Sequence, residues 1–168
     1  MGATEFSCIA LGKCASAAFK SAQDDARHAH GHEGYTGTVA EVSGFNLILL
    51  PPRVTINKAL GWAESTACLD ECESQLRDAE QCRRSGWKIP ADRMKSLRAA
   101  VRQAKTRANK VPKNHRDLAQ RIARNMSDKF GPCVCLCANA GETKRIKAER
   151  GRKGTHDHVY CFAGLASS

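Results

Sequence analysis

Residues 28–38 read HAHGHEGYTGT, and no other segment of the chain is so rich in side chains that do more than pack. These eleven positions hold three histidines, three glycines, one tyrosine and two threonines. We expect Gly31 to end a helix, because glycine adopts the left-handed conformation that follows many helices without a Cβ penalty. The histidines before it suit the negative end of the helix dipole. The segment therefore marks where an N-terminal helix stops and a strand should begin.

A strand and a helix are expected before this segment. Side chains alternate along an extended strand, so residues 4–10 place Phe6, Cys8 and Ala10 on one face. Between residues 15 and 30, alanines and one phenylalanine recur at spacings of three and four, which gathers them on one helical stripe. The pattern predicts a half-buried strand followed by an amphipathic helix.

The residues after the segment predict a β-hairpin. Two apolar runs, 38–42 and 45–50, are joined by Ser43-Gly44, and a two-residue turn with glycine is typical of tight hairpins. Pro51-Pro52 then ends the second run, because proline has no N–H to donate to a strand ladder.

The middle of the chain is expected to form three charged helices, at about 56–83, at 91–110, and from Asn114 as N-cap to about Lys129. The first has an acidic outer face. Residues 83–129 hold 15 Lys or Arg against 3 Asp or Glu, whereas residues 1–82 hold 6 against 11. The net charge of +10 therefore comes from this internal segment.

Strands return at the end of the chain. Residues 133–137 alternate, with three thiols on one face, and 158–163 are their expected partner. The basic connection from Gly141 to Gly154 is expected to be a mobile loop. The order β-α-β-β-α-α-α-β-β predicts an α+β fold with an antiparallel sheet built from N- and C-terminal strands. We expect one domain, in which 1–50 and 128–168 form the sheet and 51–127 are a basic helical insertion.

The outward cations of the insertion, with Trp87 at one end, predict a surface for a polyanion, either nucleic acid or a host ribonucleoprotein. An acidic host protein is an alternative partner. The acidic helix could neutralise part of this surface, but its six carboxylates cannot cancel fifteen cations. The candidate residues are Arg93, Lys95, Arg98, Arg102, Lys105, Arg107, Lys144, Arg145, Lys147, Arg150, Arg152 and Lys153.

The segment 28–38 is the second candidate site. Its glycine spacing resembles a phosphate loop, but such loops lead into the N-terminus of a helix, whereas here a helix ends. Acid–base chemistry could involve a functional loop of His30, His32, Glu33, Tyr35 and Thr36. No motif sets the geometry of these residues, nor that of a Cys/His nucleophile pair.

A zinc site is a further alternative. If the last strand lay beside a strand beginning at Thr38, His30 and His32 could meet His156 and His158, with thiolates from residues 133–137. The spacings C-x-x-C and H-E-x-x-H, which are typical of zinc sites, are both absent. We therefore expect no metal and no cofactor.

Composition argues against a membrane-spanning, a secreted or a disulfide-rich protein. No apolar run approaches the roughly 20 residues that span a bilayer, and we find no pattern of a secretory signal. Nine cysteines is an odd number, which argues against a closed disulfide framework. We expect a cytoplasmic protein with reduced thiols and no membrane partner.

Both ends of the chain resemble a group of small, mostly uncharacterised proteins encoded by bacteriophages. The likeness rests on an HGHxGYTGTxAE run and on an aromatic-Gly-x-Ala-Ser-Ser end. Its residues are Met1-Gly2-Ala3, Gly12-Lys13, the run from His30 to Glu41, Asp128 to Pro132, and Phe162 to Ser168. The group tends to have an aromatic pair and a tryptophan where Cys161-Phe162-Ala163 and Leu165 stand here. The resemblance implies a phage origin and a sheet that joins both chain ends; it brings no activity.

Three hypotheses follow. The first is a non-enzymatic phage accessory protein that binds a polyanion in the host cytoplasm. The second is an enzyme or metal-binding protein with its site at the His30–Thr38 loop. The third is a protein–protein interaction factor, either an inhibitor of host defence or a minor virion component.

Overall fold

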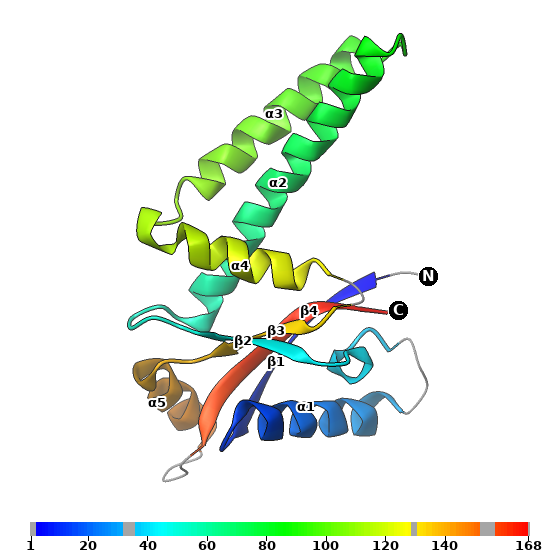
Figure 1. Cartoon of the computed structure of the whole chain (residues 1–168). Coiled ribbons are helices and arrows are strands. Elements are labelled where there is room, and N and C mark those ends of the chain that lie inside the picture. Colours follow the sequence, from blue (N-terminus) through cyan, green and yellow to red (C-terminus); the bar gives the residue numbers. More distant parts are fainter. Residues whose placement is uncertain (1–2, 32–35, 129–130, 152–156, 168) are drawn as a thin grey trace. The chain divides into compact units, whose positions relative to one another are not determined.

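The computed structural model describes residues 3–31, 36–128, 131–151 and 157–167 (Figure 1). The chain forms an α+β fold, as predicted. Its elements are, in order, β1 (Ala3–Gly12), α1 (Ala15–His30), the 3₁₀ helix η1 (Val39–Glu41), β2 (Phe45–Leu49), α2 (Ile56–Arg84), α3 (Ala91–Ala108), the 3₁₀ helix η2 (Lys113–His115), α4 (Arg116–Met126), β3 (Cys133–Cys137), α5 (Ala140–Glu149) and β4 (His158–Ser167).

Contacts divide the chain into two compact units. The first, which we call the sheet unit, consists of residues 1–59 and 124–168. The second, the helical unit, consists of residues 60–123 and contains α3, η2 and most of α2 and α4. The basic middle of the chain thus folds largely as a unit of its own.

The sheet has the strand order β1-β4-β3-β2. The two ends of the chain pair along their full strands, because β1 runs antiparallel to β4 from Ala3 opposite Ser167 to Gly12 opposite His158. The predicted antiparallel pair of 133–137 with the last strand is present as β3–β4. The prediction of a fully antiparallel sheet is corrected at one edge, where β2 runs parallel to β3.

Helix α1 covers one face of this sheet and encloses an aromatic core. The rings of Phe19, Phe45 and Phe162 form a triangle with centroid separations of 5.1, 5.1 and 5.6 Å. Phe6, Cys8 and Ala10 of β1 join this core, as the alternation predicted. The chain returns onto the sheet at Gly12, where a Cβ atom would lie 2.8 Å from the backbone nitrogen of Ala18. Only glycine allows so close a turn from β1 into α1.

The expected hairpin of residues 38–50 is absent, because its first arm is η1 rather than a strand. The Thr38 hydroxyl accepts a hydrogen bond from the Ala40 N–H and caps this short helix. The Gln23 side chain of α1 donates to the backbone carbonyl of Val42 at 2.9 Å. Val39 and Val42 are both buried in the α1 core, at the spacing of three that a helical turn needs. These contacts with α1 and the core, rather than the glycine turn, hold the segment as a helical turn.

The predicted loop from Gly141 to Gly154 is also corrected, because α5 occupies residues 140–149. The Asn139 side chain caps α5 by accepting from the Glu142 N–H at 3.1 Å, and its amide donates to Pro51 and Val54 carbonyls. The third helix of the insertion is shorter than expected: Asn114 lies inside η2 rather than at an N-cap, and α4 ends at Met126.

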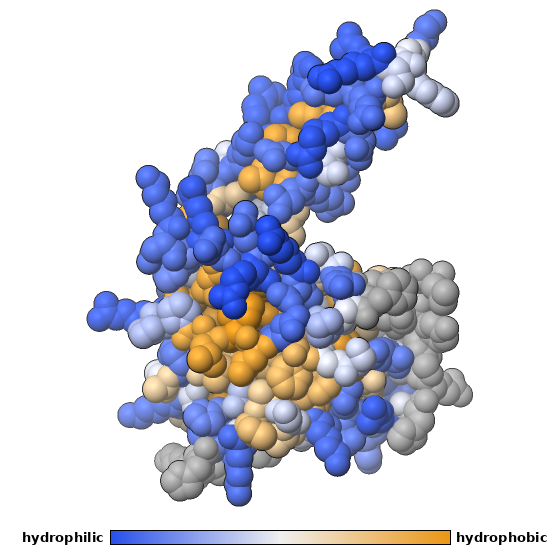
Figure 2. Space-filling view, in the orientation of Figure 1, coloured by the Kyte–Doolittle hydropathy of each residue, from blue (hydrophilic) through white to orange (hydrophobic). Residues whose placement is uncertain are grey.

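The chain contains, among its described residues, no helix that is long and apolar enough to cross a membrane. Figure 2 shows hydrophilic side chains over most of the visible face of α2 and α3. The largest exposed apolar side chains are Leu47 and Leu49, on the edge strand β2, and Trp87, which lies between α2 and α3.

We predict that Phe162→Ala lowers the free energy of unfolding by about 3–5 kcal/mol, since it removes one of the three rings of the aromatic triangle and leaves a cavity. Leu49→Ala is the matched control, because Leu49 is 70% exposed and Phe162 is fully buried. The control should change stability by less than about 0.5 kcal/mol. Urea titration followed by circular dichroism measures both. Equal losses in the two variants would contradict the proposed core.

Candidate nucleic-acid interface

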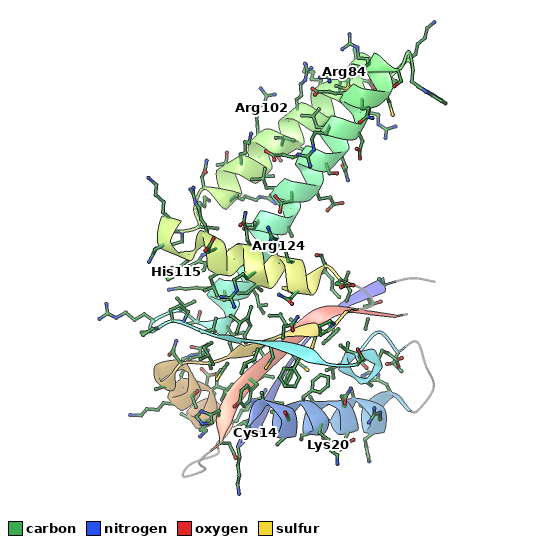
Figure 3. All side chains as sticks on the ribbon, viewed as in Figure 1. Cys14, Lys20, Arg84, Arg102, His115 and Arg124 are labelled. Carbon is green, nitrogen blue, oxygen red and sulfur yellow. The ribbon has the colours of Figure 1, made fainter. Side chains whose placement is uncertain are left out.

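Helices α2 and α3 form an antiparallel hairpin (Figure 1). Met94, Val101 and Ala104 are buried along one stripe of α3, as the spacing of its apolar residues predicted. All six predicted cations of α3 are exposed: Arg93, Lys95, Arg98, Arg102, Lys105 and Arg107. Figure 3 marks Arg102 on α3 and Arg84 at the end of α2. The helix therefore separates its apolar contact from its charge.

Four of these cations follow one another along α3. Lys95, Arg98, Arg102 and Lys105 are spaced by three, four and three residues, so they lie on one side of the helix. Neighbours at such spacings are about 5–6 Å apart, and like charges there destabilise a helix by roughly 0.2–0.5 kcal/mol per pair. This row of like charges is a local cost that an anionic ligand would remove.

The acidic helix α2 neutralises part of this row, which is the alternative that the sequence analysis left open. Arg98 lies 3.8 Å from the Glu80 carboxylate and Lys105 lies 3.2 Å from that of Glu73. Among the described residues, Lys95 and Arg102 form no such ion pair. Both ion pairs are well exposed, and pairs of this kind contribute at most about 1 kcal/mol. Every second cation of the row thus keeps its charge uncompensated.

Several of these cations line a groove of about 440 Å³ at the turn of the hairpin. Its cations come from both helices, namely Arg83 of α2 with Lys95, Arg98 and Arg102 of α3. Ile89, Ala91 and Met94 supply apolar lining. A smaller hollow beside it shares Arg83 and adds Arg84. Residues 83–102 hold seven Lys or Arg and one Asp. Sequence reasoning counted Arg83 and Arg84 in the basic segment but did not place them in the site.

Two cations of the second predicted group, Arg145 and Arg150, are engaged within the sheet unit. Arg145 pairs with the buried Glu142 at 3.0 Å and also with Glu149, and these carboxylates raise the pKa of its guanidinium. The Arg150 side chain donates to the backbone carbonyl of Ile9. Lys144 is exposed and Lys147 is half-buried, whereas Arg152 and Lys153 lie outside the described residues. Arg145 and Arg150 therefore stabilise contacts within the sheet unit.

The His30–Thr38 loop is described only at its two ends. His30 is exposed at the end of α1, and Gly31 adopts the expected positive φ of 85°. The Thr36 hydroxyl bonds the Thr38 hydroxyl at 2.8 Å and donates to Glu41, so it supports the start of η1. His32, Glu33 and Tyr35 lie outside the described residues.

His30 borders a groove of about 380 Å³ between β1 and α1, together with Cys8 and Asp25. A Cys/His nucleophile pair needs a thiol that ionises readily. Here burial, with a smaller contribution from the Asp25 carboxylate, raises the pKa of Cys8 to about 11. This thiol stays protonated at neutral pH and is a poor nucleophile.

The strand arrangement that a shared zinc site required is not present. His158 begins β4 opposite Gly12, close to the start of α1, whereas His30 ends α1. A helix of 16 residues is about 24 Å long, and two zinc-bound nitrogens lie within about 4 Å of each other. His156 and His32 lie outside the described residues. Across the ranges that are described, no three His, Cys, Asp or Glu side chains converge as a metal site would require.

The chain was compared with protein-family models, curated proteins and solved structures, and none of them matches it.

We predict that the buried thiols resist alkylation in the folded protein. Burial raises the pKa of Cys133 and Cys161 to about 12. Burial also raises the pKa of Cys135 well above its usual range. Iodoacetamide at about pH 8 should label Cys14 and Cys82, which are exposed, and leave these three intact until the chain unfolds. Peptide mass spectrometry provides the readout. Rapid labelling of Cys161 in the native protein would contradict the burial.

The same thiols should make the fold sensitive to alkali. Their raised pKa means that the folded chain keeps protons that the unfolded chain releases above about pH 9. The contribution of these thiols to the free energy of unfolding should therefore be constant below pH 9 and fall as the pH rises from 9 towards 12. Each thiol lowers the free energy of unfolding by up to about 1.4 kcal/mol for each pH unit in that range. Urea titrations at about pH 8 and pH 10 test this; unchanged stability would contradict it.

Proposed function

We propose that this chain is a non-enzymatic, phage-encoded accessory protein that binds nucleic acid through the α2–α3 hairpin. The observation that carries the proposal is the groove in which Arg83, Lys95, Arg98 and Arg102 converge. One of these four cations forms an ion pair with a carboxylate among the described residues, which leaves three positive charges around one hollow. A polyanion that enters it replaces mutual repulsion by attraction.

Nucleic acid fits the chemistry of this groove better than an acidic protein does. The row on α3 repeats a positive charge at intervals of about 5–6 Å, which suits a ligand with regularly repeated negative charge. The groove also contains Ile89 and Met94, whose apolar surface suits sugar and base edges more than carboxylates. Binding of this kind is driven by the release of counterions, and it is therefore weakened by salt and largely independent of sequence.

We predict that Lys95→Glu combined with Arg102→Glu reduces affinity for nucleic acid at least about tenfold at about 100 mM salt. The slope of log K against log salt should become smaller by about 1.5, because two phosphate contacts are lost. These positions are chosen because their reversal leaves the Glu80–Arg98 and Glu73–Lys105 pairs intact. Fluorescence anisotropy with a labelled oligonucleotide measures both quantities.

The matched control is Lys13→Glu combined with Lys20→Glu, which changes the net charge equally on two exposed residues. Lys20 lies on α1 (Figure 3) and Lys13 directly precedes that helix. The control should bind within about twofold of the original protein. An equal loss in both double variants would mean that overall charge, and not the hairpin, drives binding. Pull-down from host lysate with and without nuclease separates the alternatives: a partner that survives nuclease would indicate an acidic host protein instead.

A further inference from the structure

Trp87 occupies an unusual position in the turn between α2 and α3. Its backbone N–H donates to the Cys82 carbonyl at 3.1 Å, and the Gly86 N–H donates to the Arg83 carbonyl at 3.2 Å. Gly86 has a φ of 90°. This pair of bonds around a left-handed glycine is the Schellman motif, which ends a helix with a fixed backbone. Trp87 is therefore held on a rigid turn rather than on a free loop.

The Trp87 side chain does not make the contact that this motif usually provides. The residue after the glycine commonly packs an apolar side chain on the last turn of the helix. Trp87 is instead 73% exposed, more than any other large apolar side chain among the described residues. The indole thus presents most of its surface to solvent from a fixed backbone position.

The surroundings of Trp87 are cationic. Arg83 and Arg84 precede it, Lys88 follows it, and all three are exposed. The groove that contains Lys95 and Arg102 begins at Ile89, two residues further along the chain. From Ala91 to Arg102, α3 rises about 17 Å, which is on the order of five phosphates at the spacing of one strand of a duplex. An aromatic platform therefore lies at one end of a row of cations.

We infer that the hairpin selects single-stranded nucleic acid, with a base stacked on Trp87 and the following phosphates along the α3 groove. The inference rests on the nucleic-acid binding proposed above and specifies its ligand. Stacking platforms beside cationic grooves bind single strands with little sequence preference, because every base has a π-face. A base within a duplex already stacks on its neighbours, so an indole on a turn gains little from it. The cations alone would bind both forms.

The test uses the full chain carrying Trp62→Phe, which leaves Trp87 as its one tryptophan. Trp62 is half-buried and stacks on His115 with ring centroids 5.0 Å apart, so phenylalanine keeps an aromatic ring there. Twelve-nucleotide oligo(U) and oligo(dT) should quench the Trp87 fluorescence on binding. A twelve-base-pair duplex should quench it much less. The two oligonucleotides also show whether RNA or DNA binds more tightly.

Affinity provides the second readout, measured by anisotropy with the same ligands. Trp87→Ala should weaken single-strand binding about 5- to 100-fold, while Trp87→Phe should retain most of it, because a smaller ring still stacks. Duplex binding should change less than about twofold in either variant. If Trp87→Ala binds single strands as the original chain does, or if the duplex binds more tightly than the single strand, the inference is wrong while the proposed function stands. Absence of binding to every nucleic acid would overturn both.

Discussion

The antiparallel packing of α3 on α2 determines where the charge of this protein lies. Burial of Met94, Val101 and Ala104 orients α3, and this orientation leaves its lysines and arginines in solvent. The same packing brings Glu80 to Arg98 and Glu73 to Lys105, so the acidic helix compensates alternate members of the cationic row. Lys95 and Arg102 keep their charge beside Arg83 at the turn. Apolar burial therefore positions the groove, and the charges determine what can enter it.

The sheet unit rests on a different constraint, the pairing of the two chain ends. β1 and β4 align over ten residue pairs, and β3 lies beside β4, so the last strand is surrounded on both sides. Cys133, Cys135 and Cys161 of β3 and β4 are buried in this arrangement, where desolvation raises the pKa of Cys133 and Cys161 to about 12. Free cysteine serves here as a small apolar side chain. Five of the nine cysteines, namely Cys8, Cys133, Cys135, Cys137 and Cys161, lie in strands of this sheet.

Sequence patterns predicted the elements whose periodicity is long and uninterrupted. The spacing of Ala15, Ala18, Phe19 and Ala22 predicted α1 with its bounds, and Gly31 ends it as expected. Prediction failed where a short segment is governed by partners distant in sequence. Residues 39–41 form a helical turn because Gln23 of α1 and the core of the sheet unit hold them, and no local pattern contains that information. The α5 helix was missed although Asn139 and Glu142 carry a capping signature, because basic and glycine residues suggested a loop.

The candidate site was predicted in part. Helical periodicity placed the α3 cations outward, but it could not show that Arg83 faces Lys95 across the hairpin, which depends on the register of the two helices.

The most direct test is ultraviolet cross-linking of a bound single-stranded oligonucleotide to the full chain, followed by peptide mapping. Our account predicts cross-links within residues 83–102, centred on Trp87. Cross-links confined to α5 or to residues 28–38 would contradict it.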